Sequence, residues 1–227
     1  MRTIIFYYLY PLQLSPIIPL FFGVVNYRKL TTPVRIFFWQ LVFSLETLIG
    51  MIIAGILHTN NIWLLNLSMP VNAVLLLWMF SLWQESAFKK NIVRGICILF
   101  LCIWLIEVAL GERFFDHTII SRPLEGAIFA LAACYTIFKV NRDLEAPIID
   151  MPQFWICFGL LVYFGGMLII NLLSNTLLKS YTEILKQVYL IQPALSLISN
   201  LLFIGGFRCQ SKNKTSSGLS SSALVSS

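Results

Sequence analysis

The chain has 227 residues, of which 58% are hydrophobic and only 11% are charged. Because a soluble domain carries about 25% charged residues, this chain has too few to cover a water-facing surface, and its solvent must be lipid. The formal net charge of +6 comes from basic clusters beside apolar runs, so it does not indicate nucleic-acid binding.

Seven apolar runs follow one another along the chain, and each is long enough to cross ~30 Å of hydrocarbon as a helix. They cover about residues 3–25, 35–57, 62–83, 93–111, 118–140, 153–174 and 186–207. Helices are expected because a backbone in lipid must satisfy its own hydrogen bonds. The first run contains Pro11, Pro16 and Pro19, which predict a kinked, broken or re-entrant segment. The fourth run is the shortest.

Lysine and arginine predict the orientation of these helices. Eleven of the sixteen follow the first, third and fifth runs or lie in the tail, namely Arg28, Lys29, Arg35, Lys89, Lys90, Arg94, Lys139, Arg142, Arg208, Lys212 and Lys214. Because cytoplasmic connections collect basic residues, we predict an all-α membrane protein with its N-terminus outside and its C-terminus in the cytoplasm. Residues 1–208 would form one seven-transmembrane-helix bundle, and the Ser-rich residues 209–227 a disordered cytoplasmic tail.

Ionisable residues inside a span need a partner, a cavity or a task. Glu46 lies near the middle of the second run, which favours either a ligand anchor, a protonatable switch or a packing contact with another helix. Arg122 and Glu125 open the fifth run on one helix face, as a structural pair or as a site where Arg122 binds an anionic group. Glu107, near the end of the fourth run, is expected to extend to the interface.

Uncharged polar residues also recur at helical spacing. Ser68 and Asn72 lie one turn apart in the third run, and Gln192 belongs to a polar face of the seventh. Such residues are also ordinary contacts between membrane helices. By depth, Glu46, Glu125 and Gln192 can meet between the midplane and the outer surface, which predicts a pocket loaded from outside the cell.

Catalytic and metal-binding patterns are not visible in the sequence. His58 and His117 lie near outer connections, and the five cysteines lack metal or redox spacing. The serines have neither a nucleophile elbow nor a nearby histidine base. We therefore expect no catalytic residue, metal or cofactor, with a lipid hydrolase that uses intramembrane carboxylates as the remaining enzymatic alternative.

Several short stretches resemble small orphan bacterial seven-transmembrane-helix proteins, which occur alone or as membrane sensor modules. They are Gly23–Leu30, Glu46, Arg122–Glu125, Pro152–Trp155 and Tyr163–Gly166. The resemblance implies a seven-helix fold and a multi-pass location in the cell membrane, here a bacterial inner membrane. It implies no particular activity.

Three functions stay open at this point. The first is a non-enzymatic protein that senses or binds a small ligand through Glu46, Asn72, Arg122, Glu125 and Gln192. The second is a small-molecule or proton-coupled transporter in which Glu46 binds a proton or cation. The third is a membrane subunit or scaffold of a larger complex. The expected partners are the lipid bilayer, a small-molecule ligand and a protein in the membrane, and not nucleic acid.

Overall fold

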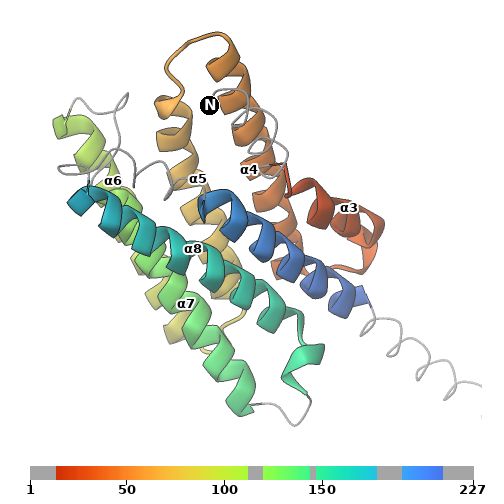
Figure 1. The fold of residues 1–227 in the computed structure, drawn as a ribbon. Coiled ribbons are helices and arrows are strands. Elements are labelled where there is room, and N and C mark those ends of the chain that lie inside the picture. Colours follow the sequence, from red (N-terminus) through yellow and green to blue (C-terminus); the bar gives the residue numbers. More distant parts are fainter. Residues whose placement is uncertain (1–13, 112–119, 144–146, 178–190, 212–227) are drawn as a thin grey trace, which may run out of the picture.

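The computed structural model describes residues 14–111, 120–143, 147–177 and 191–211, which are helical with no strand among them (Figure 1). The helices are α3 (Ile17–Val25), α4 (Thr32–Ile56), α5 (Ile62–Leu82), α6 (Ala87–Gly111), α7 (Ser121–Asp143), α8 (Pro152–Leu177) and a last helix over residues 191–211, with 3-10 turns at Tyr27–Lys29 and Ile148–Asp150. Five of these described helices, α4 to α8, are long and apolar enough to cross a membrane. The predicted all-α architecture with apolar spans is therefore confirmed.

The fourth predicted span is longer than its apolar run. α6 begins at Ala87 rather than at residue 93 and has 25 residues, so the helix extends six residues before the apolar run. The charged turn with Lys89 and Lys90 continues the helix beyond the apolar residues, because long basic side chains can reach the headgroup layer from a helix end.

The first and last segments differ from the prediction in another way. α3 has only nine residues, and Pro19 lies in its first turn, where a missing N–H leaves no helical hydrogen bond unmade. The earlier part of the first run, residues 3–13, lies outside the described residues. Helix 191–211 continues through the first residues of the predicted tail 209–227, and residues 212–227 lie outside the described residues.

Aromatic side chains hold the helices together. In Figure 1, α8 lies beside α7, and helix 191–211 lies beside α8. The ring of Phe37 on α4 is fully buried, with its centroid 4.8 Å from that of Phe203 and 6.1 Å from that of Phe207 on helix 191–211. The ring centroids of Phe129 on α7 and Phe164 on α8 lie 4.7 Å apart. Such ring pairs join consecutive helices as well as helices that are distant in sequence.

Glycines let helix 191–211 approach α8 closely. A Cβ atom added at Gly159 would overlap the ring of Phe203 and lie 3.1 Å from the carbonyl oxygen of Ser199. A Cβ at Gly166 would overlap Leu195. Small residues at helix contacts are the usual way for membrane helices to gain close backbone packing.

Basic side chains gather at one end of the described bundle, which we call the basic end. It comprises the α3–α4, α5–α6 and α7–α8 connections and the last turns of helix 191–211, with Arg28, Lys29, Arg35, Lys89, Lys90, Arg94, Lys139, Arg142 and Arg208. Lys29 Nζ donates to Ser211 Oγ at 3.5 Å, and the Arg208 guanidinium lies 4.7 Å from the ring centroid of Phe22. These contacts show that segments far apart in sequence meet at this end.

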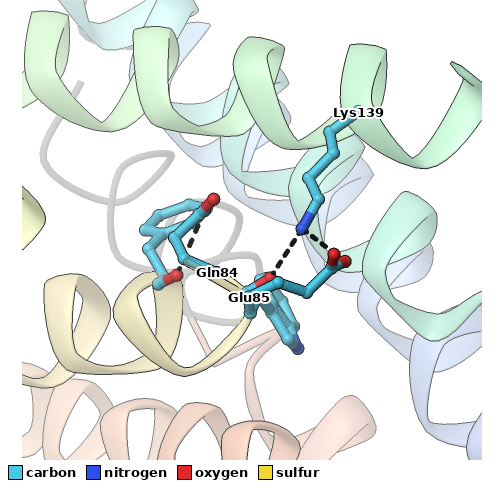
Figure 2. A network of polar contacts seen from close by, with 5 residues as sticks. Gln84, Glu85 and Lys139 are labelled. Atoms are coloured by element: carbon cyan, nitrogen blue, oxygen red, sulfur yellow. Dashed lines mark hydrogen bonds and ion pairs between the residues drawn. The ribbon is translucent and has the colours of Figure 1, made fainter. Parts of the chain in front are cut away.

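Figure 2 shows how α7 is attached at the basic end. Lys139 Nζ lies 2.9 Å from Glu85 Oε1 and donates to the carbonyl oxygen of Trp83 at 3.2 Å. Next to Glu85, Gln84 Nε2 donates to the carbonyl oxygen of Phe80 at 3.4 Å, at the end of α5. The side chain of Glu85 is 85% exposed, so the ion pair itself contributes about 0–1 kcal/mol. The contact fixes the last turns of α7 against the α5–α6 connection.

The glycine contact between α8 and helix 191–211 leads to a first prediction. Gly159→Ala should lower the free energy of unfolding by about 1–3 kcal/mol, because the added methyl group cannot fit unless the packed ring of Phe203 moves. Gly165→Ala is the matched control, since nothing lies within 4 Å of its Cβ position. Unfolding of the purified protein in mixed micelles measures both variants, and equal stabilities would contradict the close packing.

Candidate functional site

A cavity of about 310 Å³ lies between α4, α5, α7, α8 and helix 191–211. Its lining comes from α4 between Gln40 and Met51, the first half of α5, the first turns of α7, the middle of α8 and helix 191–211 up to Phe203. These parts lie away from the basic end. Four of the predicted site residues, Asn72, Arg122, Glu125 and Gln192, line this one cavity; whether they bind a ligand stays a prediction.

Glu46, the fifth predicted site residue, does not line the cavity, and its side chain is exposed. The reason is helical phase. Gln40, Ser44 and Thr47 all line the cavity from one face of α4, and Glu46 lies about 120° around the helix from Gln40 at 3.6 residues per turn. The expectation that Glu46 meets the other polar groups in this pocket is therefore wrong.

Gln40 takes the place that was expected of Glu46. Its side chain is 7% exposed, and its Nε2 donates to Ser44 Oγ at 2.9 Å and to Asn72 Oδ1 at 3.4 Å. Its Oε1 is buried and accepts no hydrogen bond within the described part of the chain. Because a buried acceptor is costly when it has no donor, this oxygen is a natural point of attachment for a ligand or a water molecule.

The polar face of helix 191–211 also lines the cavity. Asn200 Nδ2 donates to Ser15 Oγ at 2.8 Å and to Ser196 Oγ at 3.3 Å. Ser199, at 1% exposure, has a buried hydroxyl for which the described residues offer no partner. The cavity therefore has unused hydrogen-bonding capacity on two of its walls.

Charged groups enter the cavity from the first turns of α7. Arg122 and Glu125 are one helical turn apart on α7, and both line the cavity together with Tyr163 of α8. Tyr163 and Gln192 both line the cavity. A cation, a carboxyl group, a phenol and an amide thus face one another, which is a suitable set for binding a molecule with both donor and acceptor groups.

Glu107 on α6 positions the helix that carries these charges. Its Oε1 accepts the backbone N–H of Ile120 at 3.0 Å, and its Oε2 accepts the backbone N–H of Ser121 at 2.9 Å and the Ser121 hydroxyl. A carboxylate at a helix N-terminus accepts hydrogen bonds from free backbone N–H groups, and its negative charge interacts favourably with the positive end of the helix dipole. Glu107 therefore caps α7, a role that the sequence did not predict; its expected extension to the interface stays a prediction.

The remaining walls of the cavity are apolar. They include Leu41, Leu48, Met51, Leu160, Met167 and Phe203. Among the residues that the structure describes, no three histidine, cysteine, aspartate or glutamate side chains come together as a metal site. The residues that line the cavity can therefore form hydrogen bonds and ion pairs beside an apolar surface, which is typical of a binding pocket.

Comparisons with family models, curated proteins and solved structures found no match to this chain. The resemblance to small seven-helix proteins therefore stays a prediction.

The cap on α7 gives a second prediction. Glu107→Ala should destabilise the protein by about 1–2 kcal/mol, because the start of α7 loses both hydrogen-bond acceptors and a favourable charge. Glu85→Ala is the control, since that carboxylate is 85% exposed and its loss should cost about 0.5 kcal/mol or less. Chemical unfolding in mixed micelles reports the difference, and a Glu107→Ala effect no larger than that of Glu85→Ala would refute the capping role.

Proposed function

We propose that this chain is a non-enzymatic integral membrane protein that binds a small carboxylic acid in the cavity between α4, α5, α7, α8 and helix 191–211. The ligand would also carry hydroxyl or amino groups. The observation that supports this most directly is the meeting of Arg122, Glu125, Gln40, Asn72 and Gln192 at one cavity, in a chain with only 11% charged residues.

Each polar group has a role in this proposal. The planar guanidinium of Arg122 binds the ligand carboxylate, and Glu125 orients it from one turn away. Gln40 Oε1 and Ser199 Oγ, which have no partner within the described chain, accept hydrogen bonds from the ligand's hydroxyl or amino groups. The apolar walls contact its carbon atoms. A volume of about 310 Å³ suits a ligand of a few non-hydrogen atoms up to a large amino acid.

We further infer that the chain crosses the membrane seven times. Helix 191–211 is roughly 31 Å long at 1.5 Å per residue, enough for a span. Its outward residues Ile191, Ile198 and Leu201 are exposed, as suits lipid contact, whereas Gln192, Ser196, Ser199 and Asn200 line the cavity. The first run up to α3 would supply the remaining span. The positive-inside rule then assigns the basic end to the cytoplasm and the cavity to the outer half of the membrane.

Sensing is favoured over transport by the position of Glu46. The transport hypothesis needs a protonatable group on the ligand path, and the carboxyl of Glu46 lies outside the cavity. A sensor needs access from one side only, and its signal would pass to a partner protein at the basic inner connections. Transport stays the second candidate because Glu125 also lines the cavity.

The ligand proposal is tested with purified full-length protein in lipid nanodiscs. Thermal unfolding is measured with a panel of α-amino acids, α-hydroxy acids and neutral monosaccharides. At 100 times its Kd, a ligand stabilises the folded state by ~2.7 kcal/mol, so at least one acid should raise the Tm. Arg122→Gln should abolish that increase, and Glu46→Gln should preserve it. No response to any acid, or an equal response in Arg122→Gln, would count against the proposed site.

Flux separates the two candidates once a stabilising acid is found. The protein is reconstituted in liposomes, and uptake of that acid is followed with and without a proton gradient. A sensor should bind the acid without moving it. Uptake of the acid would instead favour transport, and loss of the proton-coupled part in Glu125→Gln would assign that coupling to the carboxyl group that lines the cavity.

A further inference from the structure

Glu46 belongs to a regular stripe on the outer surface of α4. Beyond the first turn, the exposed large side chains of this helix are Trp39, Glu46, Ile49, Ile53 and Ile56. Their spacing matches the a and d positions of a heptad repeat, with the partly buried Val42 at the remaining position. This is the spacing at which two helices pack along a continuous seam. We call these five exposed residues the α4 seam.

The α4 seam is long enough to cross the apolar part of a bilayer. From Trp39 to Ile56 it extends roughly 26 Å along the helix, compared with ~30 Å of hydrocarbon. Glu46 lies roughly 10 Å from the Trp39 end, and so well inside the apolar layer. Within the described part of the chain it makes no hydrogen bond or ion pair.

An exposed carboxyl group at this depth is unusual for a single bundle. Intramembrane ionisable residues face a protein interior or a water-filled cavity and pair with other polar groups, yet in one copy of this chain Glu46 faces outward. We propose that α4 is the interface with a second copy of this chain, and that the two Glu46 carboxyl groups meet at the centre of that interface.

A second copy suits this surface for two reasons. Two copies inserted in the same orientation place their α4 helices parallel, related by a two-fold axis along the membrane normal, so that each seam position meets itself. A neutral carboxyl group is both a donor and an acceptor, so two Glu46 side chains satisfy each other without a group of different chemistry. One polar residue in an otherwise apolar seam also fixes the register of the pair.

The seam faces away from the cavity, since Gln40, Ser44 and Thr47 line the cavity from another face of α4. The inference therefore does not depend on the proposed ligand site. It also accounts for Trp39, whose ring is 53% exposed but is held by its Nε1, which donates to the Tyr27 hydroxyl at 3.1 Å. A fixed aromatic side chain costs little entropy when it packs against a partner.

The test uses the full chain fused at its C-terminus to a donor or an acceptor fluorescent protein. Both forms are reconstituted together in phosphatidylcholine–phosphatidylglycerol vesicles, and energy transfer is followed as lipid is added. Glu46→Leu should weaken self-association about tenfold, as expected for the loss of one buried polar contact between membrane helices. Glu46→Gln should retain it, because an amide also donates and accepts.

A matched pair of apolar variants separates the seam from other lipid-facing surface. Ile53→Ala should weaken association, and Ile98→Ala on α6 should not, although both side chains are exposed (51% and 63%). Oxidative cross-linking of Ile53→Cys, with Ile98→Cys and the unsubstituted chain as controls, gives a second readout that does not depend on loss of association.

Three results would overturn the proposal. The first is no energy transfer above that of unrelated membrane proteins at any dilution. The second is self-association that Glu46→Leu and Ile53→Ala leave unchanged while Ile53→Cys fails to cross-link. The third is a Glu46-dependent complex with a different membrane protein in place of the self-associated form, which would assign the α4 seam to that partner.

Discussion

Polar side chains of the spans must be kept from the lipid tails, and the arrangement of the helices depends on this constraint. Inserting a charged residue at the centre of a span costs roughly 2.5–3.5 kcal/mol. An exposed ion pair stabilises a protein by only ~0–1 kcal/mol, which does not offset that cost. The polar faces of α4, α5, α7, α8 and helix 191–211 accordingly turn toward one cavity. Because these faces are not fully complementary, Gln40 Oε1 and Ser199 Oγ stay without partners in the described chain. Hydrogen-bonding capacity that the fold does not use is available to a ligand.

The charged groups of the cavity depend on α7, and this helix is held at both ends. Glu107 caps its first turn, and Lys139 attaches its last turns to the α5–α6 connection through Glu85 and Trp83. Neither contact belongs to the cavity. Both fix the position of α7 relative to α5 and α6, and therefore the place at which Arg122 enters the cavity. A binding site in lipid needs such support, because the apolar outer surfaces of the helices provide no directional contacts.

The cavity and the α4 seam assign two different roles to one helix. Its inward face supplies amide and hydroxyl groups to the proposed ligand site, and its outward face supplies Glu46 to the proposed interface. If both proposals hold, a shift of α4 on ligand binding would change the contact between the α4 helices of the two copies. That is a direct physical route from a ligand to a change in assembly.

Hydropathy predicted the helices well, because a span of apolar residues has few structural alternatives in lipid. Polarity and depth predicted that Asn72, Glu125 and Gln192 would come together with Arg122, and these four residues line one cavity. The prediction that Glu46 lines the pocket was wrong, although helical periodicity could have corrected it. Gln40, Ser44 and Thr47 share one face of α4, and Glu46 lies on another. The role of Glu107 could not be predicted, since it depends on how close α6 comes to the start of α7. The length of α6 was underestimated because charged residues continue a helix into the headgroup layer.

The most direct test of this account is the water accessibility of the cavity, measured with a cysteine at Ser196, which lines it. Ser196→Cys is placed in sealed, oriented vesicles and treated with a membrane-impermeant thiol reagent from each face, with the unsubstituted chain as background. The account predicts modification from the outer face only, opposite to the basic end, and protection when Arg122 is occupied by a bound acid. Modification from neither face, or from the basic end alone, would contradict an outward-facing binding cavity.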